Sequence, residues 1–295
     1  MVLRFVRKSW PLVPMWEESI PEPGASFVKF SSGIIILLHK NSVHKLRKNT
    51  IFARLKFMNH FSQDIVMTNE EFLEKLDAII NERHMLQHPF YQMWNTGDLT
   101  IQMLREYALE YYQQVHHFPT YVSATHSKCD DMEVRQMLLE NLIEEEHGPN
   151  NHPELWRRFG DALGVSRDEM MSRKYLPHTK QSVKILKELA GKENPAEGLA
   201  ALYAYESQIP EICTTKIEGL KNKYNLDNED ALVFFEVHED ADIIHRQVTR
   251  DALVRLCTND EQKILALDAA REAADALNLL LDGVYETYCV DKQAA

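Results

Sequence analysis

From Asn69 onward, hydrophobic residues recur at intervals of three and four, the spacing that places side chains on one face of an α-helix. Residues that cap or break helices divide this pattern into segments. Asp98 is a good N-cap, and Gly148-Pro149 would end the helix that begins at Asp131. The sequence therefore predicts one all-α bundle of seven or eight helices, in which the helix over residues 195–224 is interrupted at Ile209-Pro210. The predicted helices cover residues 70–85, 98–127, 131–147, 153–163, 182–190, 195–224, 228–256 and 260–288.

Residues 1–66 do not share this pattern. They have no sustained periodicity and carry ten Lys and Arg against four Asp and Glu, a net charge of +6, whereas the chain of 295 residues has a net charge of -12. Met67, followed by Thr68 and Glu71, is typical of a translation start before a capped helical turn. We expect an extension over residues 1–66 that is unstructured or not translated, one domain over residues 67–289 and a tail over residues 290–295.

The composition excludes several classes of protein. With 10 Gly and 11 Pro, the chain has too few turn residues for a sandwich or barrel of many strands, which needs a turn about every 8 to 12 residues. The acidic balance disfavours nonspecific binding to nucleic acid. The apolar run Gly33–Leu38 covers about a third of the ~20 residues of a membrane span, so no span is expected. Four cysteines without a CxxC pair fit a reducing compartment, which predicts a cytoplasmic location.

The segment with most chemistry lies in the predicted helix 228–256. His238, Asp242 and His245 follow one another at offsets of four and three, so they project from one helical face within about 60°. Two imidazoles and a carboxylate on one stripe form a set of metal ligands. The alternative is a solvated acidic face that carries two incidental histidines.

A buried carboxylate is expected on another helix. Glu206 lies among aromatic and apolar neighbours, where an unpaired charge is costly, so it needs a cation or a proton. A metal ion could meet this need. An Arg or Lys of an adjoining helix could meet it equally well.

The end of the predicted helix 131–147 has two interpretations. Glu144 and His147 resemble the Glu-x-x-His motif of ferritin-like di-iron bundles, but such sites need the motif twice and no second copy is found. In the other interpretation, Glu145 pairs with His152, because Gly148-Pro149 lets the chain bend back. A run of glutamates is also typical of a solvated helix end.

Several motifs occur together in a fixed order between about Glu70 and Tyr288. In that order they resemble the family of the chlamydial protein associating with death domains and its bacterial relatives. This family lies within the haem-oxygenase-like dinuclear metal oxidases, which are similar to the TenA and PqqC proteins. The matching segments are His88-Pro89-Phe90-Tyr91, Phe118 to Ala124, Cys129-Asp130-Asp131, Pro149 to His152, Ala201 to Pro210, and His238-x3-Asp242-x2-His245.

The resemblance implies a haem-oxygenase-like helical bundle and a site that holds two divalent metal ions, Fe/Fe or Fe/Mn. It selects Glu145 over Glu144 and His152 over His147. Mixed oxygen and nitrogen ligands suit iron or manganese that must bind dioxygen, and two divalent ions nearly balance three carboxylates. The implied metal ligands are Glu145, His152, Glu206, His238, Asp242 and His245.

The resemblance also implies an activity, the synthesis of the folate precursor para-aminobenzoate. Dioxygen and an external reductant would be consumed, and the aromatic ring would come from the protein's own Tyr91, once per polypeptide. Lys216 matches the amino donor, and Tyr107 and Tyr205 are candidate relays or neighbours. Without the resemblance, these tyrosines would be interpreted as packing residues and Lys216 as a surface residue.

Other functions fit the same fold. One is an oxidase that acts on an external amine or fatty acid. A second is a thiaminase-like hydrolase with Cys213 as nucleophile, since Cys213 lies seven residues after Glu206 on nearly the same helical face. A third is an interaction protein that binds host death-domain proteins, which would require export to a host cell. A homodimer is a further prediction for this chain.

Overall fold

The chain divides into two compact units, residues 1–65 and 66–295, and each is described by itself. The structure, a computed structural model, describes residues 25–29, 35–39 and 66–290. The side chains of residues 25–29, 35–39 and 240–245 lie outside this description. In the first unit, strand β1 (Ala25–Lys29) pairs antiparallel with β2 (Ile35–His39), Ala25 opposite His39. The sequence analysis did not predict this strand pair.

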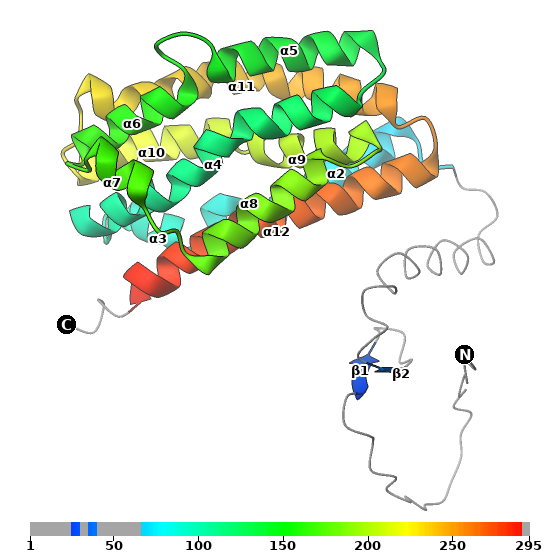
Figure 1. Cartoon of the computed structure of the whole chain (residues 1–295), viewed down its shortest axis with the longest axis horizontal. Coiled ribbons are helices and arrows are strands. Elements are labelled where there is room, and N and C mark those ends of the chain that lie inside the picture. The colour runs from blue at the N-terminus through cyan, green and yellow to red at the C-terminus, as the bar shows by residue number, and fades with distance from the viewer. Residues whose placement is uncertain (1–24, 30–34, 40–65, 291–295) are drawn as a thin grey trace, which may run out of the picture. The chain divides into compact units, whose positions relative to one another are not determined.

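The second unit is helical throughout its described residues, as predicted (Figure 1). Residues 66–290 contain eleven α-helices and one 3-10 helix. These are α2 (Asn69–Asn81), η2 (Met85–Gln87), α3 (Pro89–Thr96), α4 (Ile101–Lys128), α5 (Met132–Glu146), α6 (His152–Ala162), α7 (Arg167–Ser172), α8 (Pro177–Ala190), α9 (Pro195–Glu206), α10 (Ile209–Lys223), α11 (Glu229–Leu256) and α12 (Asp260–Tyr288).

The observed helices refine the predicted ones in two ways. The predicted helix 195–224 is two helices, α9 and α10, which meet beside Ile209-Pro210, where the interruption was expected. The short helices α3 and α7 were not predicted, because eight and six residues are too few to show a clear period.

The start of α4 differs from the prediction. Gly97 has a φ of 81° and ends α3 in the left-handed conformation that glycine adopts readily. Asp98 therefore does not cap α4, and its carboxylate accepts a hydrogen bond from Thr96 instead. Thr100 is the N-cap, and its hydroxyl accepts a hydrogen bond from the backbone N–H of Met103 at 3.2 Å.

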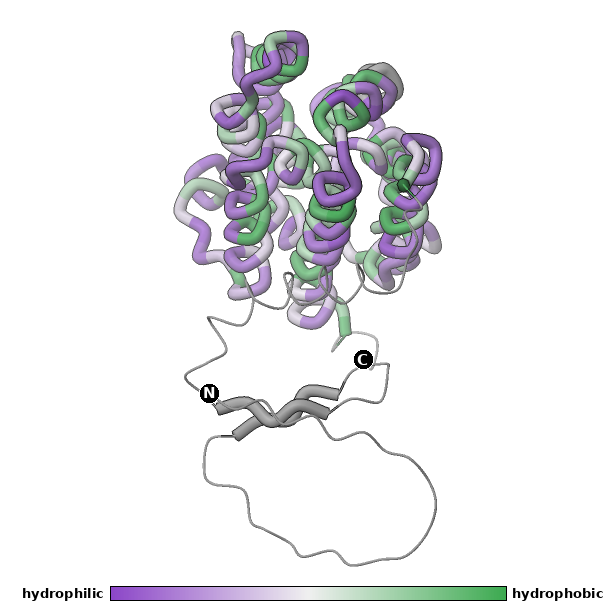
Figure 2. Tube along the Cα trace, turned by 90° about the vertical axis from the view of Figure 1, so that its right-hand side faces the viewer, coloured by the Kyte–Doolittle hydropathy of each residue, from purple (hydrophilic) through white to green (hydrophobic). Residues whose placement is uncertain are grey.

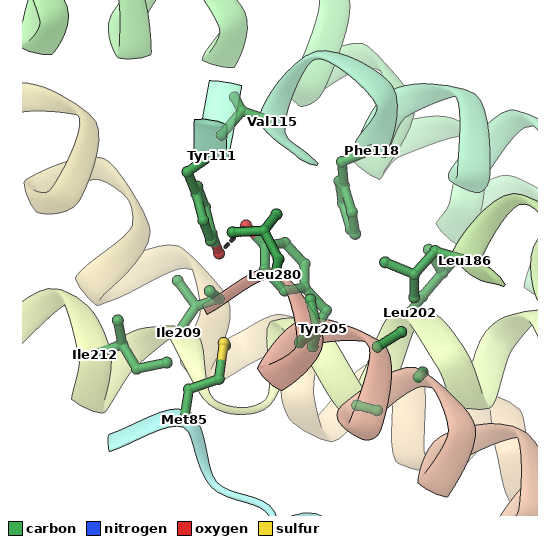
Figure 3. Packing of buried hydrophobic residues seen from close by; sticks show 14 of the residues in the cluster. Met85, Tyr111, Val115, Phe118, Leu186, Leu202, Tyr205, Ile209, Ile212 and Leu280 are labelled. Carbon is green, nitrogen blue, oxygen red and sulfur yellow. Dashed lines mark hydrogen bonds between the residues drawn. The ribbon is translucent and has the colours of Figure 1, made fainter. Parts of the chain in front are cut away.

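The helices pack around one aromatic-rich core. Helix α12 lies along α8 and α9, α10 lies along α11, and α4 contacts α5, α6 and α8. Hydrophobic and hydrophilic stretches alternate along the helices, as expected when each buries one face (Figure 2). In the core, Tyr111 and Phe118 of α4 meet Tyr205 of α9, with Leu280 of α12 beside them (Figure 3).

Among the described residues, none of the helices combines the length and the apolar character that crossing a membrane requires.

Candidate metal centre

Three predicted ligands converge at one place in the bundle. Glu145 lies in the last turn of α5, His152 is the first residue of α6, and His238 lies in the middle of α11. Their ligand atoms all lie within 4.8 Å of one another. His152 Nδ1 is 2.8 Å from Glu145 Oε2, and the ring centroids of His152 and His238 are 4.2 Å apart. Two consecutive helices, α5 and α6, and the distant helix α11 thus contribute to one cluster.

The loop between α5 and α6 brings Glu145 and His152 together. Gly148 has a φ of 82°, which turns the chain after α5. Asn151 then caps α6 by accepting from the Glu154 N–H at 3.0 Å, and its amide donates to Gly148 O at 2.8 Å. Residue 152 therefore begins the next helix and faces back toward α5.

Burial distinguishes between the two interpretations of the end of α5, in which the metal ligand is either Glu144 or Glu145. Glu145 is 7% exposed, whereas Glu144, Glu146 and His147 are exposed to solvent. The pair Glu144 and His147 lies outside the cluster. Among the described residues, no Lys or Arg forms an ion pair with Glu145, and its carboxylate lies beside the imidazole of His152. A buried carboxylate beside two imidazoles, without a basic side chain, fits a divalent cation.

A backbone hydrogen bond orients His238. Its Nδ1 lies 2.6 Å from the carbonyl oxygen of Phe234, one turn earlier on α11. A carbonyl can only accept, so Nδ1 carries the proton and Nε2 is the nitrogen suited to bind a metal.

The other predicted ligands are placed differently. Glu206, the last residue of α9, is 6% exposed, and its Oε1 accepts a hydrogen bond from Asn141 Nδ2 of α5 at 2.6 Å. It does not belong to the group of three ligands within 4.8 Å. Asp242 and His245 lie on α11, and their side chains are outside the described residues.

A second cluster contains the predicted reactive residues. Tyr91 of α3 and Tyr107 of α4 lie with their hydroxyl oxygens 3.4 Å apart. Lys216 of α10 donates from Nζ to the Tyr107 hydroxyl at 2.6 Å. Tyr91 and Tyr107 are fully buried, and Lys216 is 3% exposed. The structure thus brings these three residues together, although they come from three different helices.

Aromatic rings surround the Lys216 amine. Among the described residues no carboxylate forms an ion pair with it, so burial lowers the pKa of Lys216 to about 7. The amine is therefore partly neutral near neutral pH. Five ring centroids lie 5.0 to 5.7 Å from Nζ, those of Tyr91, Tyr107, Tyr111, Trp156 and Phe235.

Tyr111 connects this cluster to Tyr205. Its hydroxyl donates to the Tyr205 hydroxyl at 3.1 Å, and its ring centroid is 5.2 Å from that of Tyr107 (Figure 3). Burial raises the pKa of Tyr205 well above its usual value, and the nearby charge of Glu145 adds to this effect. Tyr91, Tyr107, Tyr111 and Tyr205, together with Lys216, are called the tyrosine cluster below. It extends from Tyr91 toward the metal ligands.

Sequence reasoning did not select Tyr111, Trp156 or Phe235 as site residues. Tyr111 had one usable signal, since it follows Tyr107 by four residues and shares its helical face. The other two are contributed by α6 and α11, which only the tertiary structure brings to Lys216.

Cys213 is 2% exposed and lies one turn before Lys216 on α10. Such burial gives an external substrate no access to this thiol in the described structure. The hydrolase alternative therefore gains no support from the position of Cys213.

Comparison with known proteins places these features in context. Residues 73–278 match the TENA/THI-4/PQQC family. A 4-aminobenzoate synthase of Nitrosomonas europaea is 40% identical over 234 residues, which cover 76% of this chain and 95% of that protein. A 4-aminobenzoate synthase of Chlamydia muridarum is 41% identical over 215 residues, which cover 73% of this chain and 90% of that protein.

A solved structure identifies the fold. A domain of unknown function from Shewanella denitrificans, described as having a haem-oxygenase-like fold, superposes with a TM-score of 0.62 at 18% sequence identity. The match covers 77% of this chain and 94% of that one. The predicted haem-oxygenase-like bundle is therefore confirmed.

Proposed function

The chain belongs to the TENA/THI-4/PQQC family, and from this premise we propose that it is an enzyme that synthesises 4-aminobenzoate, that is, para-aminobenzoate. The proposed product is taken from the names of the relatives, which are called 4-aminobenzoate synthases. The observation that carries the proposal is the position of the Lys216 amine. Its Nζ donates a hydrogen bond to the Tyr107 hydroxyl and lies 5.7 Å from the ring centroid of Tyr91. In the proposed reaction the nitrogen of Lys216 replaces the phenol oxygen of Tyr91, which leaves as water, while the Lys216 Cε–Nζ bond breaks. Cβ of Tyr91 becomes the carboxyl carbon when the Cα–Cβ bond is cleaved oxidatively, with dioxygen as the oxidant.

Tyr91 is the proposed source of the aromatic ring. It is fully buried, and burial raises its pKa well above the usual value, so its phenol keeps its proton at neutral pH. The same holds for Tyr107. Oxidation of Tyr91 consequently has to remove a proton as well as electrons. The adjacent hydroxyl of Tyr107 could take up that proton while it passes its own to the neutral fraction of the Lys216 amine, 2.6 Å away.

Lys216 is the proposed source of the amino nitrogen. Its depressed pKa of about 7 leaves a fraction of neutral, nucleophilic amine near neutral pH. The hydrogen bond to Tyr107 holds Nζ over the rings, and the buried setting excludes water that would compete for the oxidised ring.

The proposed metal ligands are Glu145, His152, Glu206, His238, Asp242 and His245. The first, second and fourth form the cluster described above. Tyr205 is hydrogen-bonded to Tyr111, and the charge of Glu145 acts on its pKa. Two divalent ions bound there, Fe/Fe or Fe/Mn, would supply the oxidising power of dioxygen, with an external reductant as electron source. Binding of death-domain proteins and formation of a homodimer stay predictions.

The test uses protein labelled with ring-13C tyrosine, loaded with iron or with iron and manganese, and exposed to air with a reductant. Mass spectrometry should detect labelled 4-aminobenzoate and a polypeptide with a modified Tyr91. Tyr91→Phe should abolish the product. The matched control is Tyr121→Phe, which removes a buried hydroxyl that has no hydrogen-bond partner in the described structure, and should leave the yield unchanged.

Equal yields from the unaltered chain and from Tyr91→Phe would overturn the assignment of Tyr91. Unlabelled product would indicate an external substrate. In protein whose lysines alone carry 15N, a product without 15N in its amino group would contradict the role of Lys216.

A further inference from the structure

A cavity of about 320 Å³ lies between α5, α9 and α11. Met137 of α5, Leu199 and Leu202 of α9 and Val248 of α11 give it apolar walls. Glu206, which the proposed function makes a metal ligand, also lines it. The cavity therefore has a predominantly apolar wall and one buried carboxylate, that of the proposed ligand Glu206.

The exposure of the lining residues distinguishes the outer end of the cavity from its inner end. Val248 is 41% exposed, whereas Leu199 is 1% exposed and Glu206 is 6% exposed. Val248 thus lies at the mouth, and Glu206 lies at the inner end. A small molecule that enters past Val248 therefore reaches a space lined by the buried side chains of Leu199, Leu202 and Glu206.

The end of α9 separates this cavity from the tyrosine cluster. Tyr205 and Glu206 are consecutive, so their side chains leave the helix about 100° apart. Tyr205 accepts a hydrogen bond from Tyr111, whereas Glu206 accepts one from Asn141 at the cavity. On the side of the tyrosine cluster, Tyr91 and Lys216 are buried, at 0% and 3% exposure.

We propose that the cavity between α5, α9 and α11 is the route by which dioxygen reaches the candidate metal centre. This inference rests on the proposed function. Apolar walls favour a small neutral molecule over an ion. The carboxylates of Glu140 and Glu144 also line the cavity and are exposed, so they disfavour anions such as the aminobenzoate product.

The first experiment detects the cavity with xenon, a neutral apolar gas that occupies apolar protein cavities. Methyl NMR spectra of the full-length protein under xenon pressure should show saturable shifts at Leu199 and Leu202. Val248→Trp should abolish these shifts by filling the mouth. Leu139→Trp is the matched control, since Leu139 is a 46% exposed residue on α5 that does not line the cavity, and it should leave the shifts unchanged.

The second experiment measures the rate of dioxygen uptake by protein loaded with ferrous iron, at several dioxygen concentrations. Val248→Trp should lower the second-order rate constant by about tenfold or more, because a close-packed path admits gas only when side chains move. Val248→Ala widens the mouth and should keep or raise the rate constant. Since Val248 is partly exposed, both variants are expected to fold.

Xenon shifts that persist in Val248→Trp, or a rate constant that is the same in all variants, would overturn the route. A rate that falls equally in Leu139→Trp would also overturn it. Absence of 4-aminobenzoate from the unaltered chain would overturn the proposed function alone, because xenon binding and dioxygen uptake do not depend on which product forms.

Discussion

Lys216 is the residue whose protonation should affect stability most directly. Its pKa is lowered to about 7 in the folded protein by burial, whereas the unfolded chain has a lysine of ordinary pKa. Above pH 7 the unfolded state therefore binds more protons than the folded state, so the free energy of unfolding rises with pH until the unfolded lysine also titrates.

Lys216→Met should remove this dependence. Between about pH 7 and about pH 9, the stability of the unaltered chain should increase by about 2 kcal/mol relative to that of Lys216→Met. Urea unfolding of both proteins at the two pH values measures the difference, and the comparison cancels the titration of all other groups. Parallel stability curves would show that the buried amine keeps its ordinary pKa.

Asn141 should position Glu206. It donates a 2.6 Å hydrogen bond to Glu206 Oε1, and partners of this kind orient metal ligands. Asn141→Ala should weaken binding of Mn²⁺ or Fe²⁺ by about 10- to 100-fold, as measured by competition with a chromophoric chelator. Gln136→Ala removes an exposed amide from the same helix and should leave the affinity unchanged. Equal affinities of the two variants would argue against a positioning role.

At this scale, the sequence suggested candidate ligands but not, by itself, how they are grouped. The pairing of Glu145 with His152 depended on the resemblance, because neighbouring glutamates differ only in which one the tertiary structure buries. The role of Asn141 was not predictable, since α5 and α9 meet only in the folded bundle. The backbone partner of His238, four residues earlier on its own helix, was within reach of sequence reasoning.

At the scale of the helices, the carboxylate of Glu110 on α4 binds the segment that joins α7 to α8. Glu110 is fully buried and accepts from Arg173 Nε at 3.1 Å, from the Leu176 N–H at 3.1 Å and from the Thr179 hydroxyl at 2.6 Å. Arg173 also reaches Glu106 and Tyr288, so the segment is tied to α12 as well. This network fixes the start of α8 against the core.

Glu110→Ala should therefore destabilise the protein by about 3 kcal/mol, because it leaves buried donors without an acceptor. Glu169→Ala is the control, since Glu169 is 43% exposed and lies 3.6 Å from Arg105; it should cost less than about 1 kcal/mol. Thermal and urea unfolding of both variants test this. A loss in Glu110→Ala no larger than in the control would show that the network contributes little.

The ends of a helix could be predicted from the sequence where the N-cap residue and the spacing of the apolar residues indicated the same boundary. The long helices α11 and α12 begin and end within one or two residues of the prediction, because Asn228 and Asn259 cap them and their apolar stripes are long. Helix α8 begins at Pro177, five residues before the predicted start, since its first turn carries buried Thr179 and few apolar residues to mark it. Short helices such as α3 are set by their contacts and give little periodic signal.

At the scale of the whole molecule, the second unit closes the tyrosine cluster from solvent and leaves a cavity on the other side of α9. This arrangement suits a reaction on the protein's own side chain, because the organic reactant is already inside and only a small gas has to enter. The full burial of Tyr91 would be a disadvantage for an enzyme with a large external substrate. An opening of the bundle would still be needed to release an aromatic product.

The second unit should fold without residues 1–66. Met67 is fixed at the edge of the bundle, where its N–H donates to Asp260 at 3.1 Å and its carbonyl accepts from the Lys263 amine at 2.6 Å. Thr68 then caps α2 in a reciprocal capping box with Glu71. A chain that starts at Met67 keeps all these contacts, and its new terminal ammonium would still face the Asp260 carboxylate.

We therefore expect the chain that starts at Met67 to match the full-length protein in free energy of unfolding within about 0.5 kcal/mol. Thr68→Ala in the same shortened chain removes the cap and should cost about 1 kcal/mol, which shows that the assay detects changes at this end. Urea unfolding followed by circular dichroism, together with Mn²⁺ affinity, measures both. A loss of several kcal/mol on truncation would mean that residues 1–66 stabilise the helical unit, and the division of the chain into an extension and an independent domain would be wrong.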